Sequence, residues 1–260
     1  MRWRLGVVGH PIEHSLSPVL HQTGLALARL EGSSTRVDLT LERASELRTM
    51  LEHRFDALSV TMPLKFIAGT CCDELDAVAA RIESVNSVLV RDGRVYGAST
   101  DGAGFVDACR LFADFDVRDA TAVVLGAGGA ALAIVDALVA NGARHVAVVG
   151  RTPANVSRIV ERYSAAAVFG PGGVPVDLVV NTVPTSGRTP AAAVVEGVRD
   201  STLAVDITYD PRVSAWLESY DQARCRTMNG LAMLACQAAR QMQWWWDVQI
   251  DPRTLLEAIT

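Results

Sequence analysis

Residues 121–131 read TAVVLGAGGAA, and this stretch says more about the architecture of the chain than any other. Its β-branched start predicts a buried strand, its glycines predict a tight turn, and the alanine-rich sequence that runs on to about Asn141 predicts a helix. The turn at residues 126–131 fits the pattern G-x-G-x-x-A, and a further strand is predicted at residues 145–150. A strand, this turn and a helix in that order indicate a loop that binds the pyrophosphate of a dinucleotide.

The small residues of this loop each have a physical reason to be small. Gly126 permits the tight turn, Gly128 lets the backbone approach a pyrophosphate, and Ala131 lets the helix pack closely on the strand. The N-terminus of the helix adds free N–H groups and a partial positive charge. The alternative interpretation is a glycine-rich turn that binds no ligand. The expected cofactor contacts in the loop are Gly126, Ala127, Gly128, Gly129 and Ala130.

The end of the strand at residues 145–150 indicates which dinucleotide binds. An enzyme that uses NAD usually has an acidic side chain there, which accepts a hydrogen bond from the ribose 2′-hydroxyl. This chain has Gly150, Arg151 and Thr152 instead. A guanidinium can hold a 2′-phosphate through two parallel hydrogen bonds, so the sequence favours NADP as the cofactor and leaves NAD open. The alternative for Arg151 is an ordinary surface arginine.

Strands and helices alternate through the second half of the chain. A helix is predicted at residues 153–163, and further strands at residues 166–169, 176–181, 202–207 and 224–228. This alternation implies a parallel sheet with crossover helices, so we expect an α/β protein with a Rossmann-like, doubly wound sheet. Two helices, at residues 229–246 and 252–259, follow the last strand.

The first half also mixes strands and helices. A helix is predicted to start at Ser17 as its N-cap, with Pro18 in its first turn, and another is capped by Asp101. We expect the boundary between two domains within that second helix, which gives domains of residues 1–105 completed by 229–260, and 106–228. The other predicted elements are strands 4–9, 34–40 and 57–61, helices 44–53 and 73–82, and a hairpin at 86–98 with an Asp-Gly turn.

Composition excludes several classes of protein. The 260 residues are 50% hydrophobic and 20% charged, with a net charge of -5, which is typical of a soluble globular protein and argues against a nucleic-acid partner. The five cysteines form no C-x-x-C pair, which favours a reducing, cytoplasmic location with unpaired thiols. We expect no membrane partner, because the apolar stretch 122–140 contains a glycine turn and Asp136. For the assembly of the chain, a homodimer is one alternative.

Several stretches, in one order along nearly the whole chain, resemble the shikimate dehydrogenase family. Two lie around the nucleotide loop, VLGAGGAA and GRT. The others are HPIEHSLSPVLH (10–21), SVTMPLK (59–65), SVNSVLV (84–90), GASTDGAGF (97–105), VNTVPTSG (180–187), VDITYDP (205–211) and NGLAMLACQA (229–238).

This resemblance implies two domains with the substrate in the cleft between them, and the reversible reduction of 3-dehydroshikimate to shikimate by NADPH. The small-molecule partner would be a cyclic hydroxy acid. By position, the matching catalytic pair is Lys65 and Asp101. The matching substrate contacts are Ser15, Ser17, Thr61, Asn86, Tyr209 and Gln237. The matching cofactor positions are Gly126 to Ala130, Arg151, Thr152 and Gly230.

The chemistry of these side chains suits the implied reaction. Hydride addition to a ketone makes an alkoxide, and the ammonium of Lys65 can give it a proton, with Asp101 orienting that ammonium. Ser15 and Ser17 offer hydroxyls beside a helix start, which suits a carboxylate. Hydroxyl and amide groups at Thr61 and elsewhere can sort the hydroxyls of a polyol. The alternatives are a solvated lysine, a capping aspartate and capping serines.

Two departures from the family pattern leave sister activities open. The family's Asn-Thr-Asp-Gly is Ser99-Thr100-Asp101-Gly102 here, and its Asn-Arg-Thr begins with Gly150. Quinate or aminoshikimate as substrate, with NAD or NADP, therefore remains an alternative. A nucleotide-sensing regulator without turnover agrees less well with the sequence than an enzyme does, because a sensor needs no proton donor such as Lys65. For His10 and His14 a metal site is disfavoured. For Trp244–Trp246 and for Cys71–Cys72 plain packing is expected.

Overall fold

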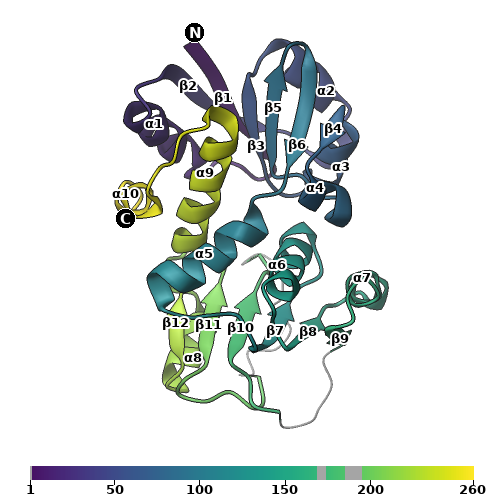
Figure 1. Cartoon of the computed structure of the whole chain (residues 1–260), viewed down its shortest axis with the longest axis vertical. Helices are drawn as coiled ribbons and strands as arrows, with labels where there is room; N and C mark the ends of the chain where they lie inside the picture. The colour runs from purple at the N-terminus through teal and green to yellow at the C-terminus, as the bar shows by residue number, and fades with distance from the viewer. Residues whose placement is uncertain (1, 169–173, 185–194) are drawn as a thin grey trace. The chain divides into compact units, whose positions relative to one another are not determined.

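The computed structural model describes residues 2–168, 174–184 and 195–260. Its internal contacts divide the chain into two compact units (Figure 1). Unit 1 is Met1–Gly104 together with Leu234–Thr260, and unit 2 is Phe105–Met233. The chain passes from unit 1 to unit 2 inside one helix, α5 (Asp101–Ala113), and returns inside another, α9 (Gly230–Trp246).

Unit 1 contains a mixed six-stranded sheet in the order β2-β1-β3-β5-β6-β4. β1 is parallel to both β2 and β3, whereas β5 is antiparallel to β3 and β6. The predicted hairpin is confirmed: Asp92 and Gly93 connect β5 to β6 with φ of 51° and 73°, as a two-residue type I′ turn requires. The strands are β1 (Arg2–Gly9), β2 (Glu31–Asp38), β3 (Ala57–Val60), β4 (Glu74–Leu75), β5 (Ser87–Arg91) and β6 (Arg94–Ala98).

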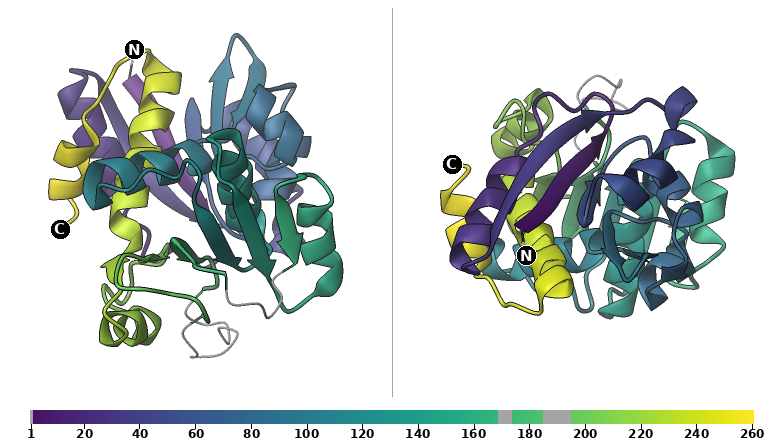
Figure 2. Two further views of the ribbon diagram at one scale, coloured as in Figure 1. Left: turned by 60° about the horizontal axis from the view of Figure 1, so that its bottom comes forward. Right: turned by 90° about the horizontal axis from the view of Figure 1, so that it is seen from above.

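Helices cover both faces of this sheet (Figure 2). Side chains that alternate along β3 contact the helices of the two faces in turn. Leu58 and Val60 belong to the core beneath α2, α3 and α4, while Ser59 between them contacts α1 and α9. The helices of unit 1 are α1 (Ser17–Leu27), α2 (Glu46–His53), α3 (Lys65–Thr70), α4 (Ala77–Ile82) and α10 (Pro252–Glu257), with the 3-10 turn η1 (Leu41–Arg43) and most of α9.

Unit 2 contains an all-parallel sheet in the order β12-β11-β10-β7-β8-β9. Numbered within the unit and read from β9, this is 3-2-1-4-5-6, the strand order of a Rossmann fold, so the predicted doubly wound sheet is confirmed. The strands are β7 (Thr121–Leu125), β8 (His145–Val149), β9 (Ala166–Val168), β10 (Leu178–Asn181), β11 (Leu203–Asp206) and β12 (Arg226–Met228).

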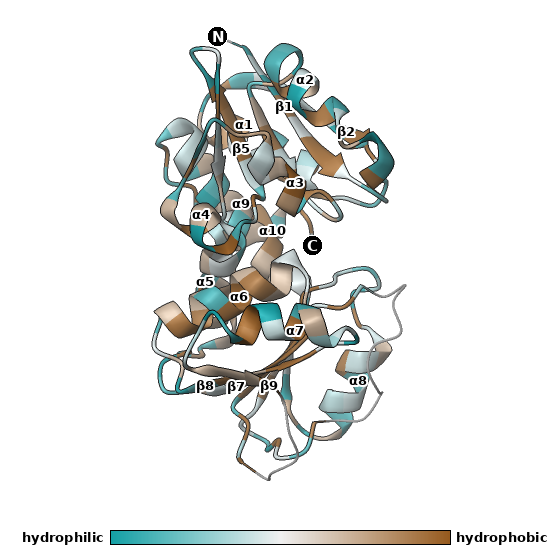
Figure 3. Ribbon diagram, turned by 90° about the vertical axis from the view of Figure 1, so that its right-hand side faces the viewer, coloured by the Kyte–Doolittle hydropathy of each residue, from teal (hydrophilic) through white to brown (hydrophobic). Residues whose placement is uncertain are grey.

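The helices of unit 2 pack on opposite faces of its sheet (Figure 3). On one face lies α6 (Gly129–Ala140), whose residues from Ala131 to Leu138 are all buried. On the other, α8 (Ala215–Gln222) inserts Trp216, Leu217 and Tyr220 into a core with β7 and β10. α7 (Pro153–Val160) follows β8. The apolar stretch of residues 122–140 is thus β7, the glycine turn and α6, and no helix within the described ranges is long and apolar enough to cross a membrane.

Several local predictions are wrong. Ser17 is not the N-cap of α1, because Leu16 holds that position and Ser17 is already helical and buried. Asp101 is likewise the first helical residue, since the carbonyl of Thr100 accepts the first helical hydrogen bond from Gly104. The helix predicted at residues 73–82 starts only at Ala77, after Asp76 as its cap. The short elements α3 and β4 and the helix α8 were not predicted.

The expectations of plain packing for the cysteines and tryptophans are confirmed. All five cysteines are free, and burial raises the pKa of Cys72 to about 12, which keeps this thiol protonated. Trp245 is 1% exposed and stacks edge-on against His21, while Trp246 contacts Trp3. Trp245 and Trp246 therefore pack within unit 1.

Candidate active site

Lys65 lies at the carboxyl end of β3, just after the Met62–Pro63 bend, and is the first residue of α3. Its Nζ donates a hydrogen bond of 2.6 Å to Oδ2 of Asp101, the first residue of α5. The two side chains are only 15% and 9% exposed. Residues 36 positions apart in sequence thus form a charge-assisted pair that is largely shielded from solvent.

Asn86 holds the other carboxylate oxygen of Asp101. The buried side chain of Asn86 accepts a hydrogen bond from the backbone N–H of Thr100 at its Oδ1, over 2.8 Å. Its Nδ2 must therefore be the donor, and it lies 2.8 Å from Oδ1 of Asp101. The same Nδ2 lies 3.3 Å from Oε1 of Gln237. The structure thus brings together four predicted site residues, Lys65, Asn86, Asp101 and Gln237.

A glycine in α5 makes room for Gln237 on α9. A Cβ at Gly104 would lie only 2.5 Å from the backbone N of Gln237 and 2.6 Å from its Cα. Only a residue without a side chain lets the two helices approach this closely. The hydroxyl of Thr100, just before α5, also donates to the carbonyl of Gln237 over 3.2 Å. Gly104 and Thr100, which the sequence did not single out, therefore help to fix the site.

The predicted residues Ser15, Ser17 and Thr61 lie at the same edge of the sheet, after β1 and β3. Parallel strands bring their carboxyl ends together, and ligands of α/β sheets bind at that edge. The hydroxyl of Ser15 accepts from the N–H of Ser17 over 3.3 Å, and the N–H of Thr61 donates to Val8 over 2.9 Å. Within the described ranges, none of these three side chains hydrogen-bonds to Lys65, Asn86, Asp101 or Gln237.

Arg36 on the edge strand β2 binds the serine segment, by which we mean residues 15–17. No pattern in the sequence indicated this contact. The Nε and Nη2 of Arg36 both donate to the carbonyl oxygen of Ser15, over 2.9 and 2.7 Å. A guanidinium bound to one carbonyl through two N–H groups fixes the direction of that peptide. Arg36 therefore orients the segment that carries Ser15 and Ser17.

The glycine loop of unit 2 lies at the point where the strand order reverses, between β7 and β10. Gly126 has φ of 116°, a backbone conformation suited to glycine, and a side chain there would collide with Thr182. Gly128 is the N-cap of α6, and a Cβ at Gly128 would meet no protein atom within 4 Å. Open space beside this glycine and the first N–H groups of α6 fits a bound pyrophosphate, with Gly129 and Ala130 opening the helix.

The segment after β8 presents Arg151 to solvent, with Thr152 as the N-cap of α7. The departure at Gly150 has a packing reason: a Cβ there would lie 2.8 Å from Cγ2 of Val156 and 3.2 Å from Cβ of Ala127. Val156 of α7 thus occupies the space that a larger residue at position 150 would need. The exposed guanidinium and the absence of an acidic residue between Val149 and Thr152 fit a 2′-phosphate.

Tyr209 and Gly230 are close to each other in unit 2. The N–H of Gly230 donates to the carbonyl of Thr208 over 2.9 Å, and a side chain at position 230 would collide with the carbonyl of Ile207. This close approach alone explains the glycine. The segment that carries Tyr209 is held by the buried carboxylate of Asp206, which accepts from the N–H and the hydroxyl of Thr208 over 3.0 and 2.8 Å.

Asp206 was quoted in a motif but not recognised as a site residue. Its second oxygen accepts from Ser214 over 2.6 Å, and Asn181 at the end of β10 donates to the first over 3.2 Å. Four donors thus satisfy a carboxyl group that is 1% exposed, as a polar group buried this deeply requires. An acidic residue that ends a buried strand is the sequence signal that would have found it.

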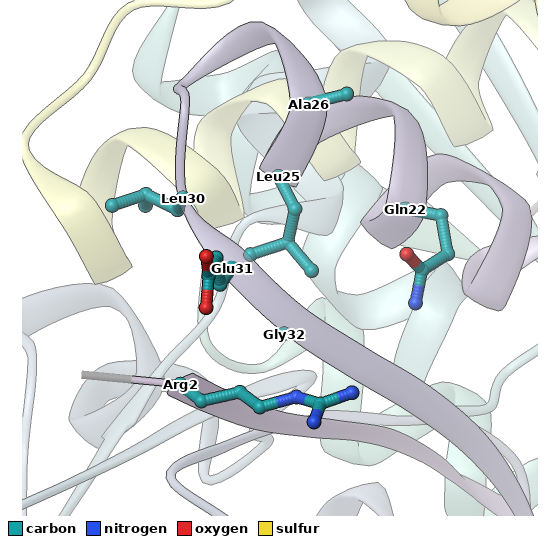
Figure 4. Close-up of a pocket in the computed structure, with 7 residues that line it drawn as sticks. All are labelled: Arg2, Gln22, Leu25, Ala26, Leu30, Glu31 and Gly32. Carbon is teal, nitrogen blue, oxygen red and sulfur yellow. The ribbon is translucent and has the colours of Figure 1, made fainter.

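One pocket of unit 1 lies away from all of these residues (Figure 4). It lies between α1 and the first residues of β1 and β2, and its polar side chains are Arg2, Gln22 and Glu31. None of its lining residues is a predicted site residue. Elsewhere on the surface His10 pairs with Asp38 over 2.7 Å, and the described residues contain no group of three acidic, histidine or cysteine side chains suited to a metal.

Comparison with known proteins points to one family for both units. Residues 7–88 match the family model of the shikimate dehydrogenase substrate binding domain, and residues 108–169 match that of shikimate / quinate 5-dehydrogenase. A shikimate dehydrogenase (NADP(+)) of an Exiguobacterium species is 34% identical over 253 residues, covering 95% of this chain and 94% of the relative. That of Methanopyrus kandleri is 30% identical, covering 98% and 94%.

Solved structures agree over nearly the whole length. Shikimate 5-dehydrogenase from Thermus thermophilus, crystallised with NADP(H) and shikimate, has a TM-score of 0.87 and 33% identity, covering 99% of this chain and 98% of its own. A 5-ketofructose reductase from a Gluconobacter species has a TM-score of 0.82 at 22% identity, covering 98% and 96%. At this identity the second likeness concerns the fold alone. Because proteins that are named for different substrates share this fold, the fold by itself does not identify which ketone is reduced.

Proposed function

Because the chain belongs to the shikimate dehydrogenase family, we propose that it interconverts 3-dehydroshikimate and shikimate, with NADPH and NADP as the redox pair. Unit 1 is the substrate-binding and catalytic domain in this proposal, and unit 2 is the dinucleotide-binding domain. The observation that carries the proposal is the 2.6 Å hydrogen bond from Nζ of Lys65 to Asp101, at the sheet edge where the serine segment also lies.

The chain's own residues account for the proton in this reaction. When bound, NADPH supplies the hydride and NADP accepts it in the reverse direction. In reduction, the ammonium of Lys65 gives one proton to the oxygen that becomes the hydroxyl, and in oxidation the neutral amine takes it back. Asp101 accepts from Nζ and so aims the ammonium, and Asn86 keeps the carboxylate from rotating away.

The remaining predicted contacts divide between the two ligands. Ser15 and Ser17, beside the N-terminus of α1, suit the substrate carboxylate. Thr61, Asn86, Tyr209 and Gln237 suit its hydroxyls, because hydroxyl and amide groups can both donate and accept. The residues that would hold NADP are Gly126 to Ala130 for the pyrophosphate, Arg151 and Thr152 for the 2′-phosphate, and Gly230.

The experiment that tests the proposal is a turnover assay of the purified chain with shikimate, quinate and aminoshikimate, each with NADP and with NAD. We expect the highest kcat/KM for shikimate with NADP. A higher value with quinate or aminoshikimate would replace the substrate and keep the chemistry. No turnover with any of the six pairs would contradict the proposed reaction and favour a nucleotide-binding regulator.

The same proposal includes a cytoplasmic location, which the free cysteines support, because a reducing compartment keeps thiols unpaired. Cell fractionation tests it directly. A monomer and a homodimer remain alternatives for the assembly, and sedimentation velocity of the purified chain distinguishes them.

A further inference from the structure

A row of polar side chains, buried except for the half-buried Ser34, leads from β2 to the backbone of Asn86. His21 of α1 is fully buried, and its Nδ1 lies 2.7 Å from the hydroxyl of Ser34 and its Nε2 lies 2.9 Å from that of Ser59. Ser59 of β3 donates to Oε1 of Gln241 over 3.0 Å, and Nε2 of Gln241 donates to the carbonyl of Asn86 over 2.9 Å. The row joins two strands and two helices of unit 1.

The direction of every hydrogen bond in this row follows from its last member. A backbone carbonyl can only accept, so Gln241 must present its NH₂ group to Asn86 and its oxygen to Ser59. The hydroxyl of Ser59 donates its only hydrogen to that oxygen, so it must accept a hydrogen bond from the N–H at Nε2 of His21. Nδ1 of His21 is then unprotonated and accepts from the hydroxyl of Ser34. Burial lowers the pKa of His21 to about 3, which agrees with this neutral tautomer.

The row ends on the residue that fixes the catalytic carboxylate. The carbonyl of Asn86 accepts from Gln241 and also from the N–H of Val60 over 2.8 Å, so both β3 and α9 hold this peptide. The side chain of the same residue donates to Asp101, which receives the ammonium of Lys65. A change in the position of the Asn86 backbone therefore changes the hydrogen bond that orients Asp101.

We propose that His21, Ser59 and Gln241 form a positioning array that sets the orientation of Asp101, and through it Lys65, by fixing the backbone of Asn86. The inference rests on the proposed function and adds positioning residues to it. His21 and Gln241 are 0% and 1% exposed, and burying an imidazole and an amide has a desolvation cost that apolar side chains of similar volume avoid. Polar groups retained at this cost, with one permitted direction for each hydrogen bond, specify geometry.

Two substitutions of His21 separate positioning from simple filling of the core. In His21→Phe the ring fills the space, but Ser59 loses the hydrogen bond that it accepts from His21. We therefore expect kcat with shikimate to fall about tenfold, while KM for shikimate and for NADP changes less than about threefold. In His21→Gln the amide N–H can still donate to Ser59, so kcat should stay within about threefold of wild type. Equal kcat values for His21→Phe and wild type would overturn the inference.

A stability control removes the remaining structural explanation. Leu20 is the fully buried neighbour of His21 on α1, and Leu20→Ala creates a cavity without touching the array. We expect Leu20→Ala to lower the Tm at least as much as His21→Phe and to leave kcat within about twofold. If kcat followed Tm across the three variants, the array would have no role beyond stability and the inference would fail.

A measurement without substrate separates this inference from the proposed function. If the wild-type chain turned over none of the substrates, the function would fail, but the carboxyl of Asp101 can still be observed by ¹³C NMR. His21→Phe should weaken the hydrogen bond from Asn86 and shift the carboxyl ¹³C resonance of Asp101, and His21→Gln should leave that resonance at its wild-type position. The same resonance position in all variants would overturn the array whatever the protein's reaction.

Discussion

At the scale of single residues, Lys65 is the group on which the proposed chemistry depends most. Lys65→Met keeps the length and volume of the side chain but removes the proton donor, while Asn86 still holds Asp101. We expect kcat with shikimate to fall at least about a hundredfold and KM for shikimate to stay within a few-fold. Steady-state kinetics in both directions measures this. Turnover equal to wild type would mean that another group transfers the proton.

Arg151 decides the cofactor prediction in the same way. Its side chain is exposed after β8, where a 2′-phosphate would be bound. Arg151→Ala should raise KM for NADPH by about tenfold or more and leave KM for NADH nearly unchanged, because only NADPH carries that phosphate. Arg158→Ala, on the neighbouring helix α7, is the control for a general loss of positive charge. Equal increases for both cofactors with Arg151→Ala would refute the assigned role.

At the scale of elements, the contact between α5 and α9 depends on a glycine. Gly104→Ala would place a Cβ 2.5 Å from the backbone N of Gln237, so one helix must shift. We expect a loss of about 2 kcal/mol in the free energy of unfolding and a fall in kcat/KM, since Gln237 moves with α9.

A second glycine in a helix provides the matched control. In Gly69→Ala of α3 the new Cβ would find its nearest atom at 3.8 Å, which is ordinary contact. This variant should be as stable as wild type or slightly more stable, because alanine favours the helix. Urea unfolding of both variants measures the difference, and equal stabilities would show that the α5–α9 contact tolerates a methyl group.

Elements that carry a strong local pattern were predictable, and those formed by tertiary contacts were not. β7, its glycine loop and α6 follow directly from residues 121–131, and the Asp-Gly hairpin from its turn. The helix α3 has only six residues, Lys65–Thr70, and its buried Ala68 packs against a core that the sequence does not display. α8 did carry a signal, because Ser214 caps it and Trp216, Leu217 and Tyr220 share a face, but no prediction was made there.

The same distinction applies to the site. Lys65, Asn86 and Asp101 lie in motifs and were named from sequence, and the structure joins them by hydrogen bonds. Ser59 and Gln241 lie 182 positions apart, and no spacing rule connects residues that meet only when α9 packs on β3. His21 was quoted inside a motif without a role, because a lone histidine on a helix gives no information about its partners.

At the scale of the whole molecule, His21 makes stability depend on pH. Its pKa is about 3 when folded and about 6.5 when unfolded, so between these values the unfolded chain binds a proton that the folded chain does not. Stability contributed by neutral His21 is therefore complete above about pH 6.5 and is lost as the pH falls toward 3. From pH 7.5 to 5 this amounts to about 2 kcal/mol.

The comparison of wild type with His21→Gln measures that contribution. Glutamine does not titrate, so the variant should lose about 2 kcal/mol less than wild type when the pH is lowered from 7.5 to 5. Urea unfolding followed by tryptophan fluorescence is suitable, because Trp245 stacks against His21. Parallel losses in both proteins would mean that His21 is not the group responsible.

The division of the chain into units has a consequence for its biosynthesis. Unit 1 needs Leu234–Thr260, and both Gln237 and Gln241 lie in that segment. A ribosome makes these residues only after all of Phe105–Met233, so the nucleotide-binding half has its complete sequence while the half with the lysine still lacks a helix. The nascent polypeptide therefore completes the proposed acid–base site only when α9 emerges and packs on a sheet whose first strand was synthesised more than two hundred codons earlier.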